Sequence, residues 1–318
     1  MRIKRILAIL VFAGSLLSCS DDTWPSSGRT NVLWLGTSIP SGCSYPSYSC
    51  KSNGAYCLNK AVGSSFMCSR SVEEKGVGYV GLSLTETVDE KEKRYRRYVD
   101  NGKLSRKRLK AFKASSYENA VLPYVGSADV VVVDHGFNDI DNLHELYKDR
   151  NTIPDNDTLW NSFDRSNYIG AFNYLMREIK KVNSGVVVMV GGYFQNSCTI
   201  DYTAGGRYIQ QVSEDIARHY GIQVLDVWNY VDIPDGYKPG SENYIDSINR
   251  KYRKNFVKWN PNVRGEITYF QIFCPDAVHP FSDPTGTSQR TLNAAFSEVM
   301  AKRLAEAGYK KSEDAEEF

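Results

Sequence analysis

The feature that most constrains the fold is a series of short apolar runs rich in Val, Ile and Leu, separated by helical-looking stretches. The clearest runs are DVVVVD at 129–134 and VVVMV at 186–190. Their unbroken apolar character is typical of parallel strands buried on both faces. NVLWL at 31–35 and IQVLDV at 222–227 are similar, and 55–59 is a weaker candidate. This alternation predicts an α/β fold with a parallel sheet of about five strands.

The stretches between and after these runs supply the crossover helices. Residues 169–182 and 207–220 have apolar side chains at helical spacing, and 285–307 opens with turn residues and continues as a long amphipathic helix. The length of 318 residues suits one large domain or two modest ones.

The N-terminus has the features of an export signal. A basic start is followed by the mainly apolar run 6–17, which is too short for a bilayer, since spanning takes roughly 20 apolar residues. Leu16-Leu17-Ser18-Cys19 resembles the lipobox of bacterial lipoproteins. The resemblance implies that 1–18 are removed and that Cys19 carries a lipid; the alternative is an ordinary secreted protein cut nearby.

The lipoprotein resemblance sets the expected domain organisation and location. It implies a protein of the cell envelope, anchored in the outer membrane through its N-terminal lipid, and leaves open whether it faces the periplasm or the exterior. The polar segment 19–30 is then a flexible tether, 31–309 the folded domain and 310–318 a frayed tail.

Export also bears on the cysteines, because an oxidising compartment allows disulfides. Six cysteines remain after Cys19 is set aside. We expect disulfides within the quartet Cys43, Cys50, Cys57 and Cys68, with their connectivity open, and a Cys198–Cys274 bridge. The chain lacks a CxxC pair, so no metal site is expected.

The overall charge is nearly balanced, with 39 Lys and Arg against 37 Asp and Glu. This balance argues against a nucleic-acid-binding protein, which usually carries a strong basic excess. The segment 89–113 departs from it, with eleven basic and four acidic side chains. A solvated helical face is the simpler interpretation, and a basic rim for anionic glycans, lipopolysaccharide or lipid headgroups is the alternative.

Residues that could take part in catalysis follow three of the predicted strands. The run 31–35 leads directly into Gly36-Thr37-Ser38, so Ser38 stands where open α/β sheets bind ligands, although this sequence is also ordinary turn chemistry. Gly63 follows 55–59 and can present an unhindered backbone N–H. Asn138 follows 129–134 and can act as an oxyanion donor or simply cap a turn.

A fourth segment lies near the C-terminus. Asp276 and His279 stand three residues apart on one predicted loop. A serine nucleophile needs an imidazole to take its proton and a carboxylate to orient that ring, and this pair can supply both. The alternative is a surface aspartate beside a loop histidine.

Together, in this order, the four segments resemble the SGNH or GDSL-type hydrolase superfamily. The resemblance implies a flavodoxin-like three-layer α/β/α sandwich that acts on esters without a cofactor or metal. Ser38 would be the nucleophile, His279 the general base and then acid, and Asp276 the residue that orients His279. The oxyanion hole would consist of the Ser38 backbone N–H, Gly63 and Asn138.

Thr37 departs from the family pattern, which commonly has Asp before the serine, and this puts the usual bracing of the nucleophile loop in doubt. We expect a lipid-anchored serine esterase that forms an acyl-enzyme, with an O-acetylated glycan as substrate. Alternatives are a lysophospholipase or short-chain lipase, a non-catalytic glycan-binding lipoprotein that keeps the fold, and a membrane-surface adhesion protein.

Aromatic residues in the segment 140–168 have two interpretations. They can form a wall on which sugars stack, or they can be local core. The residues concerned are Tyr147, Trp160, Phe163 and Tyr168. His135 lies close enough to Asn138 to line the site, but a structural role is the simpler interpretation.

Overall fold

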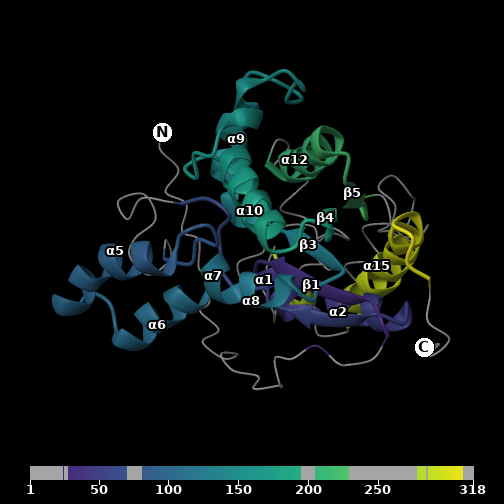
Figure 1. The fold of residues 1–318 in the computed structure, drawn as a ribbon, viewed down its shortest axis with the longest axis horizontal. Helices are drawn as coiled ribbons and strands as arrows, with labels where there is room; N and C mark the ends of the chain where they lie inside the picture. Colours follow the sequence, from purple (N-terminus) through teal and green to yellow (C-terminus); the bar gives the residue numbers. More distant parts are fainter. Residues whose placement is uncertain are drawn as a thin grey trace, which may run out of the picture.

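The computed structural model describes residues 24, 28–69, 81–194, 205–228, 278–283 and 286–310. At its centre is a five-stranded sheet in which every neighbouring pair is parallel, in the order β2-β1-β3-β4-β5 (Figure 1). The strands are β1 (Asn31–Gly36), β2 (Tyr56–Asn59), β3 (Val130–Asp134), β4 (Val187–Gly191) and β5 (Gln223–Leu225). Each of the five predicted runs therefore forms a strand.

Helices cover both faces of the sheet, which makes a three-layer sandwich and confirms the predicted fold class (Figure 1). One face carries α2 (Tyr45–Ser52) and α15 (Thr287–Glu306), which pack against each other. The other face carries α9 (Ile140–Tyr147), α10 (Tyr168–Val182) and α12 (Gly205–Tyr220). β1 and β3 are buried by both layers, which explains their unbroken apolar sequences.

The other helical elements of the described chain complete the fold. They are α1 (Ser38–Gly42), α5 (Val88–Asp100), α6 (Arg106–Ala114), α7 (Tyr117–Ala120), α8 (Leu122–Val125) and the 3₁₀ turns η1 (Phe137–Asp139), η2 (Thr158–Asn161) and η4 (Pro280–Ser282). The predicted helices 169–182, 207–220 and 285–307 correspond to α10, α12 and α15. Asn167 begins α10 by accepting a hydrogen bond from the Gly170 N–H at 2.8 Å.

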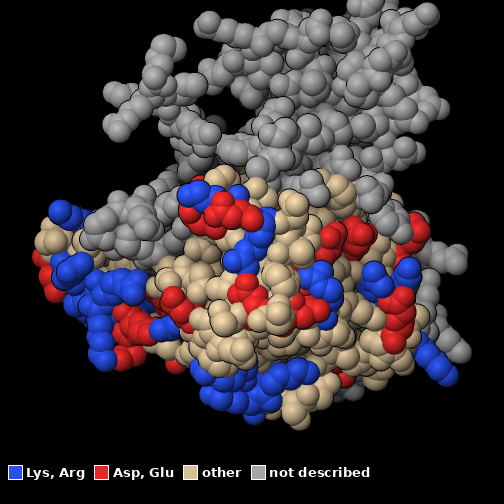
Figure 2. Space-filling model, turned by 90° about the horizontal axis from the view of Figure 1, so that it is seen from above, with Lys and Arg blue, Asp and Glu red and all other residues tan. Residues whose placement is uncertain are grey.

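The basic segment forms the helical hairpin α5–α6, which projects from one side of the molecule (Figure 1). Figure 2 shows Lys and Arg side chains gathered at that side. The hairpin has a small core of its own: Leu82, Tyr95, Leu104, Leu109 and Phe112. The interpretation as a solvated face is wrong for Lys91, which is fully buried and donates to the Phe112 carbonyl and the Ser115 hydroxyl, both at 2.9 Å.

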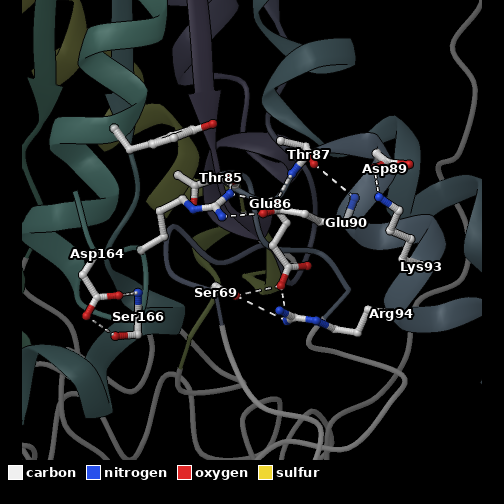
Figure 3. A network of polar contacts seen from close by, with 12 residues as sticks. Ser69, Thr85, Glu86, Thr87, Asp89, Glu90, Lys93, Arg94, Asp164 and Ser166 are labelled. Carbon is white, nitrogen blue, oxygen red and sulfur yellow. Dashed lines mark hydrogen bonds and ion pairs between the residues drawn. The ribbon is translucent and has the colours of Figure 1, made fainter.

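A polar network fastens the start of α5 to the rest of the molecule (Figure 3). Thr87 and Glu90 form a capping box, in which each side chain accepts from the other residue's backbone N–H. Arg165 donates to both Glu90 carboxylate oxygens, at 2.7 and 2.5 Å, and to the Thr85 carbonyl. The hairpin is therefore held at its base by a bidentate ion pair.

The predicted disulfides within the N-terminal cysteine quartet are absent from the structure. None of the four described cysteines, Cys43, Cys50, Cys57 and Cys68, forms a disulfide. They lie on different elements, and three of them are buried in the main core as small apolar side chains. Burial raises the pKa of the Cys50 thiol well above its ordinary value, and a hydrogen bond with Cys57 adds to this shift. Cys198 and Cys274 lie outside the described residues.

Several other expectations also concern residues outside the described ranges. These are the signal segment 1–18, Cys19 and the tail from 311 onward. Within the proposed tether, Trp24 packs edge-on against the Tyr56 ring and donates to the Tyr124 carbonyl at 3.0 Å. Among the helices in the described ranges, none combines the length and hydrophobicity that crossing a bilayer requires.

Candidate functional site

Ser38 lies at the carboxyl edge of the sheet, as the first residue of α1 after β1. The turn between strand and helix is tight: a Cβ at Gly36 would lie 2.3 Å from the Pro40 ring and 2.7 Å from the Asp134 carbonyl oxygen. Only glycine fits there without displacing β3. This turn presents the half-buried Ser38 hydroxyl at the edge where open α/β sheets carry their sites.

His279 meets Ser38 from a segment 241 residues further along the chain. The Ser38 Oγ and the His279 Nε2 lie 2.8 Å apart, which is hydrogen-bond distance. This is the separation at which an imidazole can take the proton of an attacking hydroxyl. The structure therefore brings together the two residues that the sequence placed at opposite ends of the domain.

The loop that carries His279 is held by short-range contacts. The Ser282 N–H and hydroxyl both donate to the His279 carbonyl, at 3.0 and 2.6 Å. The Phe281 ring lies 4.7 Å from the His279 ring and rests on Gly42 of α1, where an added Cβ would meet it at 2.3 Å. This contact joins the histidine loop to the helix that begins with Ser38. Asp276 lies outside the described residues.

The loop containing Gly63 is hydrogen-bonded along the end of β1. The Lys60 N–H donates to the Trp34 carbonyl at 2.8 Å, and the Val62 N–H donates to the Gly36 carbonyl at 2.9 Å. The Ser65 hydroxyl donates to the same Gly36 carbonyl at 3.0 Å. Gly63 is exposed, with open space where a Cβ would stand.

Asn138 lies in η1, just past the end of β3, and faces the Gly63 loop. Its side-chain amide donates to the Ser65 carbonyl at 2.8 Å. An amide nitrogen carries two hydrogens, so the second can serve a ligand. The next residue, Asp139, is fully buried and accepts from the Met67 and Cys68 N–H groups, at 2.8 and 3.1 Å. The Gly63 and Asn138 segments are thus locked to each other.

Asp134 was not singled out in the sequence, although it ends β3 beside the nucleophile turn. Its carboxylate accepts from the Tyr45 hydroxyl at 2.6 Å and from the Trp34 indole at 3.2 Å. Burial raises the pKa of this carboxyl to about 6, against the opposing effect of the two hydrogen bonds. The Tyr45 ring of α2 stacks on Phe296 of α15 at 4.0 Å, so Asp134 links the sheet to the helical layer formed by α2 and α15.

His135 takes the structural role rather than lining the site. It is buried, and desolvation lowers the pKa of its imidazole to about 3, so the ring is neutral. Its carbonyl accepts from the Tyr168 hydroxyl at 2.9 Å.

The sugar-stacking interpretation of the segment 140–168 is wrong for three of its four aromatic residues. Tyr147, Trp160 and Tyr168 are buried in the main core, where α9 packs on α12 and η2 packs on α10. Phe163 is exposed and lies under the Arg177 guanidinium at 4.5 Å.

Thr37 is buried and extended, and its side chain does not cap α1. Other groups hold the nucleophile turn. Besides the bonds that Gly36 accepts, the Asn59 side-chain amide donates to the Pro40 carbonyl inside α1 at 2.8 Å, and the Asn59 side-chain carbonyl oxygen accepts from the Ala61 N–H. Asn59 therefore couples α1 to the Gly63 loop, a bracing that does not need an aspartate at position 37.

The described part of the chain contains no cluster of three His, Cys, Asp or Glu side chains suited to a metal ion. The polar group in contact with the Ser38 hydroxyl is the His279 imidazole, and this pair is suited to proton transfer.

Comparison with known proteins finds similar solved structures. They include a possible lipase from Chitinophaga pinensis, 13% identical over 88% of this chain and 99% of that one, with a TM-score of 0.40. A lipase from a goat rumen metagenome is 12% identical over 89% and 99%, with a TM-score of 0.38. A lipase/acylhydrolase from Enterococcus faecalis is 13% identical over 86% and 97%, with a TM-score of 0.34.

No protein-family model matches the sequence, and the search of curated proteins finds no match. The three solved structures are described as lipases or acylhydrolases. The fold class of this chain follows from the parallel order of its own sheet and from the helices on both faces of that sheet.

Proposed function

We propose that the protein is a serine hydrolase that cleaves carboxylic esters through an acyl-enzyme on Ser38. The observation that carries the proposal is the 2.8 Å separation between the Ser38 hydroxyl and His279 Nε2 at the carboxyl edge of the sheet. In this role His279 is the general base and Asp276 orients its ring. The resemblance of the sequence blocks to SGNH hydrolases supports the same assignment.

The first half of the reaction forms the acyl-enzyme. Ser38 Oγ attacks the ester carbonyl carbon while His279 Nε2 takes the hydroxyl proton. The carbonyl oxygen becomes an oxyanion, which accepts hydrogen bonds from the Ser38 and Gly63 backbone N–H groups and the Asn138 amide. As the intermediate collapses, the bond to the alcohol oxygen breaks, and the protonated imidazole returns its proton to the leaving alcohol.

The second half releases the acid. A water molecule gives a proton to His279 and adds to the acyl carbon, and the resulting intermediate expels Ser38 Oγ, which is reprotonated by the imidazolium. The His279 imidazole carries every proton in this scheme, so the scheme uses side chains and water alone. The hydrogen bond from the Asn138 amide to the Ser65 carbonyl supports the proposed pairing of Asn138 with the Gly63 loop as oxyanion donors.

For the substrate we propose an O-acetylated glycan, met in the bacterial cell envelope by a protein anchored through a lipid on Cys19. A lysophospholipid or short-chain acyl ester is the nearest alternative within the same chemistry. Mass spectrometry of the N-terminal peptide tests the anchor, because a lipidated Cys19 is heavier than an unmodified one by the mass of its acyl chains.

A fluorophosphonate probe tests the reaction. Wild-type protein should be labelled, and Ser38→Ala protein should not. Ser41→Ala is a matched control because this exposed serine lies on the same helix. Its labelling should equal that of the wild type. Folded wild-type protein that takes no label would refute the proposal and favour a non-catalytic glycan-binding protein.

The substrate class is decided by turnover. Wild-type and Ser38→Ala proteins are compared on nitrophenyl esters of increasing chain length, acetylated oligosaccharides and a lysophospholipid. Cleavage of the acetylated sugars with loss of activity in Ser38→Ala supports the glycan esterase. Activity that survives in Ser38→Ala would remove this serine from its role.

A further inference from the structure

A cleft of about 520 Å³ opens beside the Gly63 loop, between that loop and helices α6 to α8. Its volume lies within the range of roughly 300–1,000 Å³ that is usual for small-molecule sites. The proposed chemistry at Ser38 does not use it. Small apolar side chains, including Ala61, Val62 and Ala120, form part of its lining.

Three lysines and no carboxylate are among the described residues that line this cleft. Lys60 comes from the Gly63 loop, and its ammonium lies 4.3 Å above the Tyr124 ring. Lys113 pairs with Glu92 at 3.0 Å. Lys110 is exposed and forms no hydrogen bond or ion pair with the part of the chain that the structure describes. The lining of the cleft therefore carries more basic than acidic side chains, and Lys110 is its exposed lysine.

Uncharged polar groups are also available in the cleft. Asn119, another lining residue, uses its side-chain NH₂ to donate to the Lys113 carbonyl at 2.9 Å, which leaves its side-chain carbonyl oxygen as an acceptor for a ligand hydroxyl. Lysines, an amide oxygen and small apolar groups together suit a sugar ring that carries an anionic group. An anion without hydroxyls would use only the lysines.

One short loop of the chain, residues 62–63, links the lining of the cleft to the candidate site. Val62 lines the cleft, its N–H is bonded to the Gly36 carbonyl, and Gly63 is the next residue. Gly36 is only two residues from Ser38, a chain distance of roughly 7 Å at most. Because the loop beside the cleft is bonded so close to Ser38, we expect a ligand bound in the cleft to extend toward the acyl group at Ser38.

We propose that this lysine cleft binds an acidic sugar residue of the substrate, so that the enzyme prefers esters of anionic glycans. The inference rests on the proposed esterase function and extends it to the charge of the alcohol portion. The helical hairpin contributes through α6, which supplies Lys110 and Lys113. The proposal assigns the basic rim, the alternative interpretation of the segment 89–113, to the part of α6 that lines this open cleft.

Binding is tested by calorimetry at low ionic strength with Ser38→Ala protein, which cannot consume a ligand. The probes are an oligogalacturonate, a sulfated heparin-derived oligosaccharide of equal length and a neutral cello-oligosaccharide. At least one anionic probe should bind clearly more tightly than the neutral one, and the better probe identifies carboxylate or sulfate. Added salt should weaken that binding.

Substitutions then locate the site. Lys110→Gln should weaken binding of the anionic probe by about three- to five-fold, and Lys110→Glu by about ten-fold or more. Lys110→Arg should retain binding. Lys107→Gln is the matched control, because this exposed lysine of α6 does not line the cleft, and its effect should stay below about two-fold. Equal losses at Lys107 and Lys110 would overturn the proposal.

Other outcomes overturn it as well. These are equal affinity for neutral and anionic probes, and binding to anionic lipid vesicles without binding of either acidic oligosaccharide. The two proposals can fail separately. A wild-type chain that labels with fluorophosphonate but binds no acidic sugar rejects the cleft alone. A chain that binds the acidic sugar through Lys110 but takes no label rejects the esterase alone.

Discussion

Replacing Asp134 by asparagine should change how the stability of the fold depends on pH. Burial raises the pKa of this carboxyl from its ordinary value of 3.8 to about 6. The folded state therefore holds the proton more tightly than the unfolded state. The stabilisation from this group is fully present below the unfolded pKa and is lost as the pH rises through the folded value.

The size of the effect follows from the two pKa values. A shift of this size is worth at most about 3 kcal/mol, because each unit corresponds to about 1.4 kcal/mol. Between about pH 4 and about pH 7.5, wild-type protein should lose about 2 kcal/mol of unfolding free energy through Asp134. The asparagine side chain of the Asp134→Asn variant does not titrate in this window, and its carbonyl oxygen can accept the bonds from Tyr45 and Trp34.

Urea denaturation of wild-type and Asp134→Asn proteins at several pH values measures the effect. The difference between the two unfolding free energies cancels the titration of all other groups. It should shift by about 2 kcal/mol in favour of the asparagine variant as the pH rises from about 4 to about 7.5. A pH-independent difference would show that Asp134 has an ordinary pKa, and a shift of opposite sign would show that its ionised form is favoured.

Three further predictions concern the oxyanion donor, the histidine loop and the helical hairpin. Asn138→Ala should lower kcat by about 100- to 1,000-fold. Asn142→Ala is the control, because it also removes a hydrogen bond from a side-chain amide to a backbone carbonyl, and it should leave kcat within about two-fold. Equal losses of kcat in the two variants would contradict the role of Asn138. Gly42→Ala should push Phe281 away and lower kcat several-fold while the circular dichroism spectrum stays unchanged; an unaltered kcat would show that Phe281 does not position His279. Burial lowers the pKa of Lys91 to about 7, so wild-type stability should rise from about pH 7 to about pH 9.5, and this rise should be missing in Lys91→Met during urea titrations.

The central sheet was predictable from the sequence because its signal is local. The apolar runs at 129–134 and 186–190 are long enough to require burial on both faces, and this requirement is met by a central position in a parallel sheet. The helix 169–182 was predictable for the same reason, since one face of it must be buried. Its observed start differs by one residue, where the Asn167 cap begins the helix.

The cysteines and the aromatic segment could not be interpreted in the same way. Whether Cys43 and Cys50 pair depends on the distance between their elements, and the fold uses both as small core residues. Tyr147 and Trp160 are aromatic in either interpretation, and the packing of α9 and η2 decides that they are buried. Lys91 looks like a surface charge by sequence, and it is buried because a backbone carbonyl and a hydroxyl accept its hydrogen bonds inside the hairpin.

By itself, the sequence determined the strands, the main helices and the order of the polar blocks that follow them, because hydrophobic burial and turn chemistry act over a few residues. Only the tertiary structure decided that Ser38 and His279 lie 2.8 Å apart across 241 residues. It also decided that Ser65 joins the Gly63 and Asn138 segments, and that Lys110 faces a cleft. These are distances between residues remote in the chain, and they are fixed by how the layers pack rather than by any local pattern.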